Sequence, residues 1–378
     1  MEIVINIGVA FLNLIYCFHK LAPVRNRVSV ISRQSAAPSP DVKLLLEEIG
    51  KEYPEIETQA LYRMIPPGLF GKVKYLFHMM GPEMHALATS RVVILEGYCI
   101  TASVLRHRRS LQILQMWHAL GICKKFGYYV EGEAEGYSPK LIRALRMHRN
   151  YDAILASSEF CRPYYAKAFH YPEETVKVLP LPRVDLLRSS VFMEARGNRI
   201  RAAYPELGDG KKNILYAPTF RKGVDTAEAI RGLIDAADRT RFNLIVKLHP
   251  VERRKLDLEG VFRCSEYSSM ELLSVADYVI TDYSAFLFEA AVAGRPLFFY
   301  TWDLDVYLQR RGFCIDFPSE MPQELYREPE KVMKAIEEER WDPVKQKAFA
   351  DRFVAGGTRN TNKLAQFVEL LYNKSINV

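Results

Sequence analysis

The segment YVITDYSAFLFEAAVAGRPLFFY (278–300) constrains the fold of this chain more than any other stretch. Its opening YVI consists of strand-forming residues, and the following FLFEAAVA has the composition of a helix. A proline and the apolar run LFFY come directly afterwards, so the segment predicts a strand–helix–strand unit with very short connections. Units of this kind build parallel α/β sheets.

The junction inside this unit joins the carboxyl end of a strand to the start of a helix. Ser284 is a favourable N-cap, and Gly294 suits the position just after the helix. Free N–H groups and the positive end of the helix dipole favour a phosphate here, with the hydroxyls of Thr281 and Ser284 as further donors. A capped helix with no ligand is the alternative interpretation.

Two blocks of α/β alternation predict two domains. Apolar runs at 92–95, 111–116, 153–156 and 176–179 end in polar residues in the first half. A polar helical stretch at 190–205 separates them from runs that begin near 213, 242, 278 and 296. We therefore expect an α/β protein with two Rossmann-like domains, 1–190 and 191–378, with ligands at the carboxyl ends of the strands.

Composition adds few constraints to this interpretation. The net charge of +7 fits an anionic partner such as a nucleotide or a lipid phosphate. The six cysteines form no C-x-x-C pair, so neither a disulfide framework nor a zinc site is indicated. The chain contains no G-x-G-x-x-G and no Walker A sequence, and no basic–aromatic module typical of nucleic-acid binding.

The first residues, MEIVINIGVAFLNLIY, form an apolar stretch of about 14 residues, shorter than the roughly 20 that span a bilayer. The stretch lacks the features of a signal peptide, and basic residues follow it. Two interpretations are open. The stretch is a helix in the membrane interface, or it is the first buried helix of the fold.

Polar residues at strand ends of the second domain predict an anion site. Arg221, the Lys247–His249 pair and the helix that starts near Ser284 follow three different strands, and their convergence on one sheet edge would suit a pyrophosphate. The sequence Asp303-Leu304-Asp305 has the form of a metal-binding D-x-D, but a loop between a strand and a helix is the interpretation we favour, and we expect no metal.

The fragments ILYAPTFR, VKLHP, VITDYSAFLFEAA, RPLFFYTWDLDVY and RRGF occur in this order, with QMWHALGICKKFGY and LPRVDLL upstream. Together they resemble the CDP-glycerol glycerophosphotransferases of wall teichoic acid synthesis, over most of the chain from about residue 14. The chain departs from the family pattern at Ala119, Ala285 and Glu289, where members commonly have Gly, Ser and Asp. These departures leave the donor polyol, glycerol or ribitol, open.

The resemblance implies a GT-B fold, with two facing Rossmann-like domains and a cleft between them. It implies transfer of glycerol phosphate from CDP-glycerol to an undecaprenyl-diphosphate-linked saccharide, with release of CMP and without a cofactor. The length is similar to that of the primase branch. The expected location is peripheral, on the cytoplasmic face of the cell membrane.

The resemblance also implies roles for particular residues. His118 would be the general base, although a capping or core histidine beside Trp117 is the alternative. His249 would donate to the phosphoryl group. Lys247 in the same motif would bind phosphate or have a structural role. Asp282 would orient His249 or cap the helix. The remaining phosphate-binding candidates are Thr219, Arg221, Thr281, Ser284 and Arg311.

The segment SPKLIRALRMHRN places basic residues at every third position, which predicts one stripe on a helix. Lys140, Arg143, Arg146 and Arg149 form this stripe, and with Trp117 they are our acceptor and membrane candidates. A solvated helix face is the alternative.

Two other functions remain open alongside the transferase. One is another GT-B enzyme that acts on a nucleotide sugar, either a glycosyltransferase or an epimerase. The other is a membrane-associated scaffold without activity.

Overall fold

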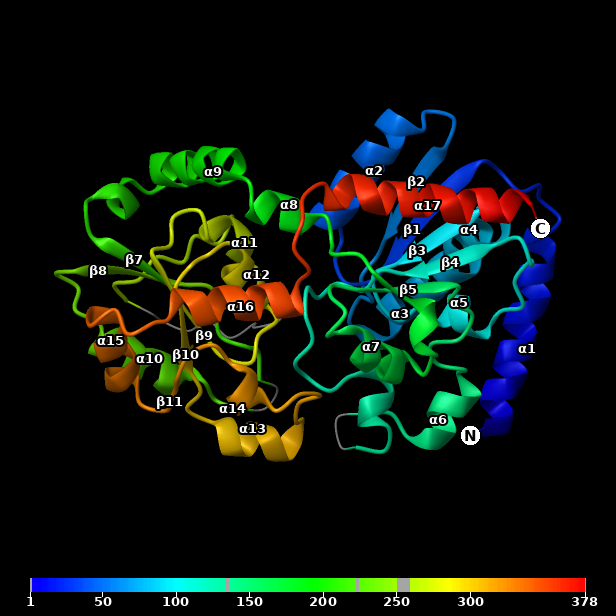
Figure 1. Ribbon diagram of the computed structural model, residues 1–378. Coiled ribbons are helices and arrows are strands. Elements are labelled where there is room, and N and C mark those ends of the chain that lie inside the picture. The colour runs from blue at the N-terminus through cyan, green and yellow to red at the C-terminus, as the bar shows by residue number, and fades with distance from the viewer. Residues whose placement is uncertain (1, 134–135, 222–223, 250–258, 378) are drawn as a thin grey trace. The chain divides into compact units, whose positions relative to one another are not determined.

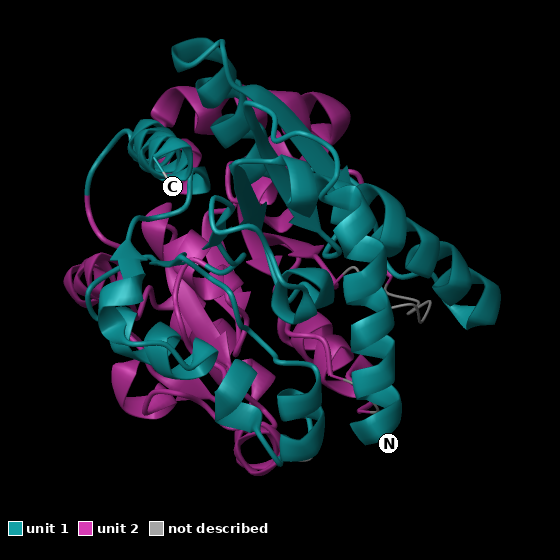
Figure 2. Ribbon diagram, turned by 90° about the vertical axis from the view of Figure 1, so that its right-hand side faces the viewer, with its two compact units in different colours: residues 1–119, 125–183, 357–378 teal, residues 120–124, 184–356 magenta. Residues whose placement is uncertain are grey.

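The computed structural model describes residues 2–133, 136–221, 224–249 and 259–377, and these residues divide into two compact units. Unit 1 comprises residues 1–119, 125–183 and 357–378, and unit 2 comprises residues 120–124 and 184–356 (Figure 2). The division falls at 183, close to the expected boundary at 190. The C-terminal segment is a correction to our expectation, because it belongs to unit 1: its helix α17 (Asn360–Ile376) packs on α2, β3 and β4 of that unit (Figure 1).

Unit 1 contains a six-stranded sheet in the order β2-β1-β3-β4-β5-β6, in which neighbouring strands pair in parallel. The strands are β1 (Arg27–Ser32), β2 (Glu57–Tyr62), β3 (Val92–Leu95), β4 (Gln112–Gln115), β5 (Ala153–Ala156) and β6 (Val176–Val178). The other elements are α1 (Glu2–His19), α2 (Pro40–Glu52), α3 (Gly68–His78), the π-helix η1 (Met79–Glu83), α4 (Met84–Thr89), α5 (Ile100–Val104), η2 (Gly127–Val130), α6 (Pro139–Ala144), α7 (Arg162–Phe169) and η3 (Glu173–Thr175).

Unit 2 contains a five-stranded parallel sheet in the order β11-β10-β9-β7-β8. The strands are β7 (Lys212–Tyr216), β8 (Phe242–Val246), β9 (Tyr278–Thr281), β10 (Leu297–Tyr300) and β11 (Leu325–Tyr326). The helices are α8 (Arg183–Leu187), which begins on the last residue of unit 1, then α9 (Ser190–Ala203), η4 (Pro205–Gly208), α10 (Ala227–Ala236), α11 (Ser269–Leu272), α12 (Phe286–Val292), α13 (Leu304–Arg310), α14 (Phe317–Glu320), α15 (Pro329–Glu337) and α16 (Pro343–Phe353).

The central strands are apolar because helices cover both faces of each sheet. Every residue of the inner strands β3, β5, β9 and β10 is buried, which explains their largely apolar sequences. The strands of unit 2 run in the same direction, so the segments after β7, β8, β9 and β10 emerge at one edge. The residues predicted to bind phosphate follow these strands, which confirms the expected GT-B arrangement of two Rossmann-like sheets.

Helix α1 does not fit the interpretation of the N-terminus as the first buried helix of the fold. It continues through His19 and, among the described residues, is the one helix long and apolar enough to cross a membrane. It is not a buried core helix, because only Val9 and Tyr16 are buried. The expectation that the segment is too short to span is therefore wrong by the criteria of length and composition.

Candidate active site

Asp282, directly after β9, connects the strand ends of unit 2. The carboxylate is fully buried and accepts hydrogen bonds from the Thr219 backbone N–H at 3.0 and 3.1 Å. The Thr219 hydroxyl donates to it at 2.7 Å, and the Arg221 guanidinium lies 2.8 Å away. These partners replace both roles expected for Asp282, because its carboxylate contacts Thr219 and Arg221 instead of orienting His249 or capping a helix.

Arg221 is held by a second carboxylate. Its Nε and Nη2 donate to Asp303 at 2.5 and 2.9 Å, and its Nη1 donates to the Thr219 carbonyl at 2.8 Å. The guanidinium also lies over the rings of Tyr283 and Trp302, at 5.4 and 5.2 Å. Burial alone would lower the pKa of Arg221, but Asp282 and Asp303 outweigh that effect and raise it.

Arg221 is therefore a correction to the predicted set of phosphate clamps. Its donors are used within the protein and its side chain is almost entirely buried, so it fixes the loop that carries Thr219 in place. Thr281 is corrected for the same reason, since its fully buried hydroxyl donates to the Ala217 carbonyl at 2.9 Å.

Lys124 is the cation that sequence reasoning missed. Its ammonium group donates to the Thr219 hydroxyl at 3.4 Å and lies 5.8 Å from the centre of the Tyr307 ring. Burial is the main cause that lowers its pKa to about 8, opposed by Asp282 and reinforced by Arg311. A lysine with this pKa is largely charged at neutral pH and suits an anionic ligand.

The short segment 120–124 explains how Lys124 reaches unit 2. Lys124 forms an antiparallel bridge with Phe313, and the N–H of Cys314 donates to the Cys123 carbonyl at 2.7 Å. Gly121 packs so closely that an added Cβ would lie 2.6 Å from the Phe288 ring. The sequence GICKK carries no periodic signal that would have indicated this placement.

The other predicted cations belong to the same edge of unit 2. His249 follows β8 and is exposed, with its ring 6.2 Å from that of Phe220. Partial loss of solvation by the surrounding protein and the nearby charge of Lys124 lower the pKa of His249. Arg311 is exposed at the end of α13, and its charge acts on Lys124. Lys247 donates to the carbonyls of Cys264 and Ser265 at 3.3 and 3.1 Å, which agrees with the alternative interpretation that Lys247 has a structural role.

Ser284 was the predicted N-cap of α12 but lies one position before the observed cap. The N-cap of α12 is Ala285, and the Ser284 hydroxyl accepts from the Phe286 N–H at 3.3 Å. Ser284 is half-buried, so its hydroxyl is the accessible member of the predicted Thr281–Ser284 pair. Gly294 follows the helix with φ +66°, as predicted for this position.

The two carboxylates of the D-x-D sequence bind arginines. Asp303 holds Arg221, and Asp305 forms a bidentate pair with Arg327 at 2.5 and 2.9 Å. Within the described residues, no three His, Cys, Asp or Glu side chains gather into a potential metal site.

His118 follows the carboxyl end of β4 in unit 1. Its Nδ1 lies 2.8 Å from the Glu96 carbonyl, which can only accept, so Nδ1 carries the proton and Nε2 of the neutral ring is an acceptor. The ring is accessible to solvent, and the surrounding protein lowers its pKa despite that hydrogen bond. A neutral imidazole with an unprotonated Nε2 is the form that a general base requires.

The backbone around His118 is held on both sides. Trp117 has φ +61° and stacks on Phe126 with ring centres 4.7 Å apart. Arg183 donates to the His118 carbonyl at 3.3 Å and is itself held by Asp41, through its N–H and its Nε at 2.7 Å each. The sequence did not indicate the pairing of Asp41 with Arg183, because the two residues lie 142 positions apart.

The predicted basic stripe is only partly helical. Lys140 and Arg143 are exposed on α6, which ends at Ala144. Arg146 and Arg149 lie in the following turns, and Arg146 has φ +47°. The prediction of one four-residue helix stripe is therefore wrong.

Comparison with known proteins identifies the family. Residues 14–370 match the family model of CDP-Glycerol:Poly(glycerophosphate) glycerophosphotransferase. The chain is 30% identical to a teichoic acid ribitol-phosphate primase of Bacillus spizizenii, over 92% of both proteins. It is 27% identical to a teichoic acid glycerol-phosphate primase of Bacillus subtilis, over 85% of this chain and 82% of that one. The solved structure of the wall teichoic acid polymerase TagF superimposes with a TM-score of 0.75 at 22% identity, over 99% of this chain and 96% of that chain, and shares its fold. The chain belongs to the CDP-glycerol glycerophosphotransferase family of teichoic acid biosynthesis.

Proposed function

We propose that this chain transfers a polyol phosphate from a CDP-polyol to a hydroxyl group of a lipid-linked saccharide, with His118 as the general base. The observation that carries this assignment is the hydrogen bond from His118 Nδ1 to the Glu96 carbonyl. It leaves Nε2 as the acceptor in the neutral ring, while the lowered pKa keeps the ring neutral near physiological pH.

In the proposed reaction, His118 Nε2 takes the proton of the acceptor hydroxyl. The hydroxyl oxygen attacks the β-phosphorus, a new P–O bond forms, and the bond from that phosphorus to the bridging oxygen breaks. CMP leaves with the bridging oxygen. Lys124, His249, Arg311 and Ser284 in unit 2 would bind the diphosphate and stabilise its developing charge.

Asp282, Asp303 and Arg221 have an indirect role in this proposal. They fix Thr219 and, through its hydroxyl, the position of Lys124. A cation held in place before the substrate binds requires little reorganisation during the reaction.

We infer that CDP-glycerol is the donor, as the family model describes. CDP-ribitol is the second candidate because the ribitol-phosphate primase of Bacillus spizizenii aligns over almost the whole chain. The primase step is our preferred assignment for either donor.

Helix α1 supports our proposal for the acceptor and the location. This helix exposes large apolar side chains along most of its length, with Ile3 at 75% and Phe18 at 67% exposed. Tyr16 and Asn13 bind protein groups on its other side, which favours a helix lying in the membrane interface over a spanning one. We therefore propose peripheral attachment to the cytoplasmic face of the membrane, where a lipid-linked saccharide is within reach.

A substitution of His118 tests the proposed base. His118→Asn should lower kcat by about 10²–10⁴-fold and leave the Kd for CDP-glycerol within a few-fold, because the base acts only in the chemical step. His170→Asn is the matched control, since His170 is an exposed histidine of unit 1 with φ +61°, a conformation that asparagine tolerates. A kcat of His118→Asn within threefold of the wild-type value would show that His118 is not the general base.

A further inference from the structure

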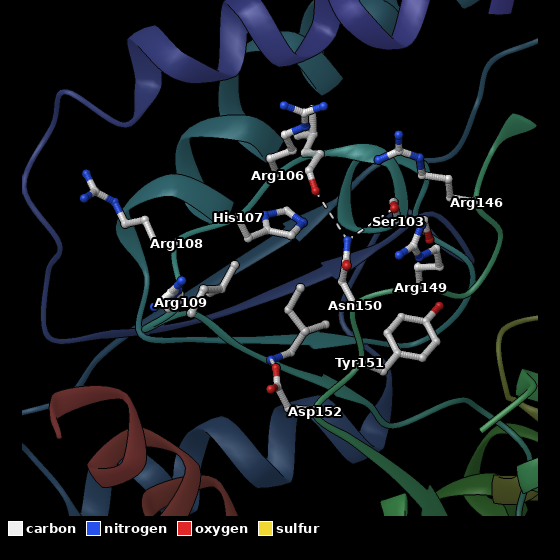
Figure 3. Close-up of a pocket in the computed structure, with 13 residues that line it drawn as sticks. Ser103, Arg106, His107, Arg108, Arg109, Arg146, Arg149, Asn150, Tyr151 and Asp152 are labelled. Carbon is white, nitrogen blue, oxygen red and sulfur yellow. Dashed lines mark hydrogen bonds between the residues drawn. The ribbon is translucent and has the colours of Figure 1, made fainter. Parts of the chain in front are cut away.

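A cavity of about 410 Å³ lies in unit 1, away from His118 (Figure 3). Its walls include Leu111 and Asp152, which precede β4 and β5, whereas His118 follows β4. Because these strands are parallel, the cavity lies at the amino edge of the sheet and His118 at the carboxyl edge. The volume falls in the range of about 300–1,000 Å³ common for ligand pockets.

The cavity is strongly cationic. Five arginines line it against a single aspartate, and Arg108 and Arg109 lie on one side of Asn150 with Arg146 and Arg149 on the other (Figure 3). The fifth arginine is Arg106.

The remaining polar groups of the cavity do not offset this charge. The Asp152 carboxylate accepts from the Ile113 N–H at 2.8 Å. His107 binds the Tyr16 hydroxyl at 3.0 Å and the Ala102 carbonyl at 2.8 Å, and burial lowers its pKa to about 4. His107 is therefore neutral at physiological pH.

One arginine is structural and the others are available. Arg108 donates to the carbonyls of Lys20, Ala22 and Ala88. In the part of the chain that the structure describes, the guanidinium groups of Arg106, Arg109, Arg146 and Arg149 form neither a hydrogen bond nor an ion pair. Guanidinium groups with free donors suit the oxygens of a phosphate group.

The segment 146–150, which carries Arg146 and Arg149 into the cavity lining, has unfavourable backbone conformations. Arg146, His148 and Asn150 have φ of +47°, +58° and +70°. The left-handed region costs a residue other than glycine or asparagine roughly 1–2 kcal/mol, so the surrounding contacts must stabilise it. Asn150 provides such contacts by donating to the carbonyls of Ala102 and Ser103 at 2.9 and 3.2 Å.

Helix α1 borders the segment that carries Arg106 and Arg108. Asn13 accepts from the Arg106 N–H at 2.8 Å, and the Lys20 ammonium group donates to the Arg106 carbonyl at 3.1 Å. The opposite face of the helix exposes a stripe of five large apolar side chains: Ile3, Ile7, Phe11, Leu14 and Phe18, between 57% and 75% exposed. Their positions recur at helical spacing, so they form one face.

The diameter of α1 determines how far the cavity would lie from the hydrocarbon region of a bilayer that α1 contacts. An α-helix with its side chains is about 10 Å across. If the apolar stripe of α1 lies in the outer hydrocarbon region, the arginines on its other side are at the level of the lipid phosphates.

We propose that this cavity binds a phosphate group, and that the group is the headgroup of an anionic lipid. The site is separate from the catalytic base and does not depend on the transfer reaction. Free phosphate or diphosphate shares the same chemistry and is distinguished by the experiment.

The test compares the wild-type full chain with the double variant Arg106→Gln/Arg109→Gln, in which both changed side chains are exposed. Partition into phosphatidylcholine vesicles with and without phosphatidic acid is measured by co-sedimentation. Titration calorimetry with inorganic diphosphate reports on the soluble ligand. Lys140→Gln/Arg143→Gln is the matched control, because it removes the same charge from α6, outside the cavity.

The double variant should lose roughly 30-fold in partition to vesicles with phosphatidic acid, about fivefold for each basic residue. Its partition to pure phosphatidylcholine and its CMP release with a short water-soluble acceptor should match the wild type. An equal loss in the control pair, or wild-type behaviour of the double variant with both vesicles and diphosphate, would overturn the proposal. Loss of diphosphate binding with unchanged vesicle binding would support a phosphate site but assign it to a soluble ligand. A failure of His118→Asn to reduce turnover would leave these results unchanged, so the two proposals fail separately.

Discussion

Removing the Arg221 side chain should destabilise unit 2 strongly. Arg221→Ala leaves Asp282 and Asp303 without their cation, and these residues are only 0% and 8% exposed. Breaking a buried ion pair by removing one partner costs about 3–5 kcal/mol, because the remaining charge stays buried and unpaired. For a domain of about 180 residues, each kcal/mol lowers Tm by about 2–4 °C, so we expect a fall of roughly 6–20 °C.

Intrinsic fluorescence is a suitable assay, because two of the three tryptophans, Trp302 and Trp341, lie in unit 2 and pack against its core. The matched control is Arg327→Ala, which removes an arginine from an equally bidentate but exposed pair with Asp305. Exposed pairs contribute little, so Tm should hardly change.

Neutral replacements distinguish lost charge pairing from lost packing. Arg221→Met combined with Asp282→Asn and Asp303→Asn should recover part of the lost stability, because the unpaired charges are gone. Equal Tm shifts for Arg221→Ala and Arg327→Ala would refute the reasoning, since burial would then make no difference.

Three further variants test the site. The affinity for CDP-glycerol should be nearly constant around pH 7 and fall as Lys124 loses its proton near pH 8, and Lys124→Arg should remove this dependence in calorimetric titrations between pH 7 and 9. The pKa of His118 is lowered, and a base must be deprotonated to act, so kcat should stay high down to below pH 6.5 in a pH–rate profile; an acidic limb centred above 6.5 would contradict this. Thr281→Val should lower the free energy of unfolding by about 1–3 kcal/mol, because it leaves the buried Ala217 carbonyl without its hydrogen bond, and should leave the donor Kd unchanged. Ser284→Ala should instead raise the donor Kd in the same calorimetric assay, and the reverse pattern would restore Thr281 as a ligand.

Most inner strands of both sheets could be predicted from the sequence because burial on both faces favours apolar residues, as in β3, β5, β9 and β10. The edge strands β2 and β11 could not. β2 has the sequence ETQALY and no fully buried residue, since it lies at the margin of its sheet. A strand of this composition does not differ from a loop in its local pattern.

The gathering of polar residues at one edge of unit 2 was also predictable, because the strands are parallel. Which of these polar side chains bond to one another could not be predicted. Arg221 was expected to bind phosphate, but Asp282 and Asp303 hold its donors, and this depends on side-chain directions set by tertiary packing. Lys124 could not be found because a five-residue segment joins unit 2 without any periodic pattern.

Helix α17 shows the same limit. Its apolar residues recur at helical spacing, but periodicity does not say which sheet the apolar face covers. The contact with α2, β3 and β4 assigns the end of the chain to the first unit.

The most direct test of the central claim measures CMP release by the purified full chain with a lipid-linked saccharide acceptor. CDP-glycerol, CDP-ribitol and a UDP-sugar are compared as donors under the same conditions. Our account predicts acceptor-dependent CMP release from a CDP-polyol, highest with CDP-glycerol, and no turnover of the UDP-sugar. Turnover of the UDP-sugar with no CMP release from either CDP-polyol would contradict it.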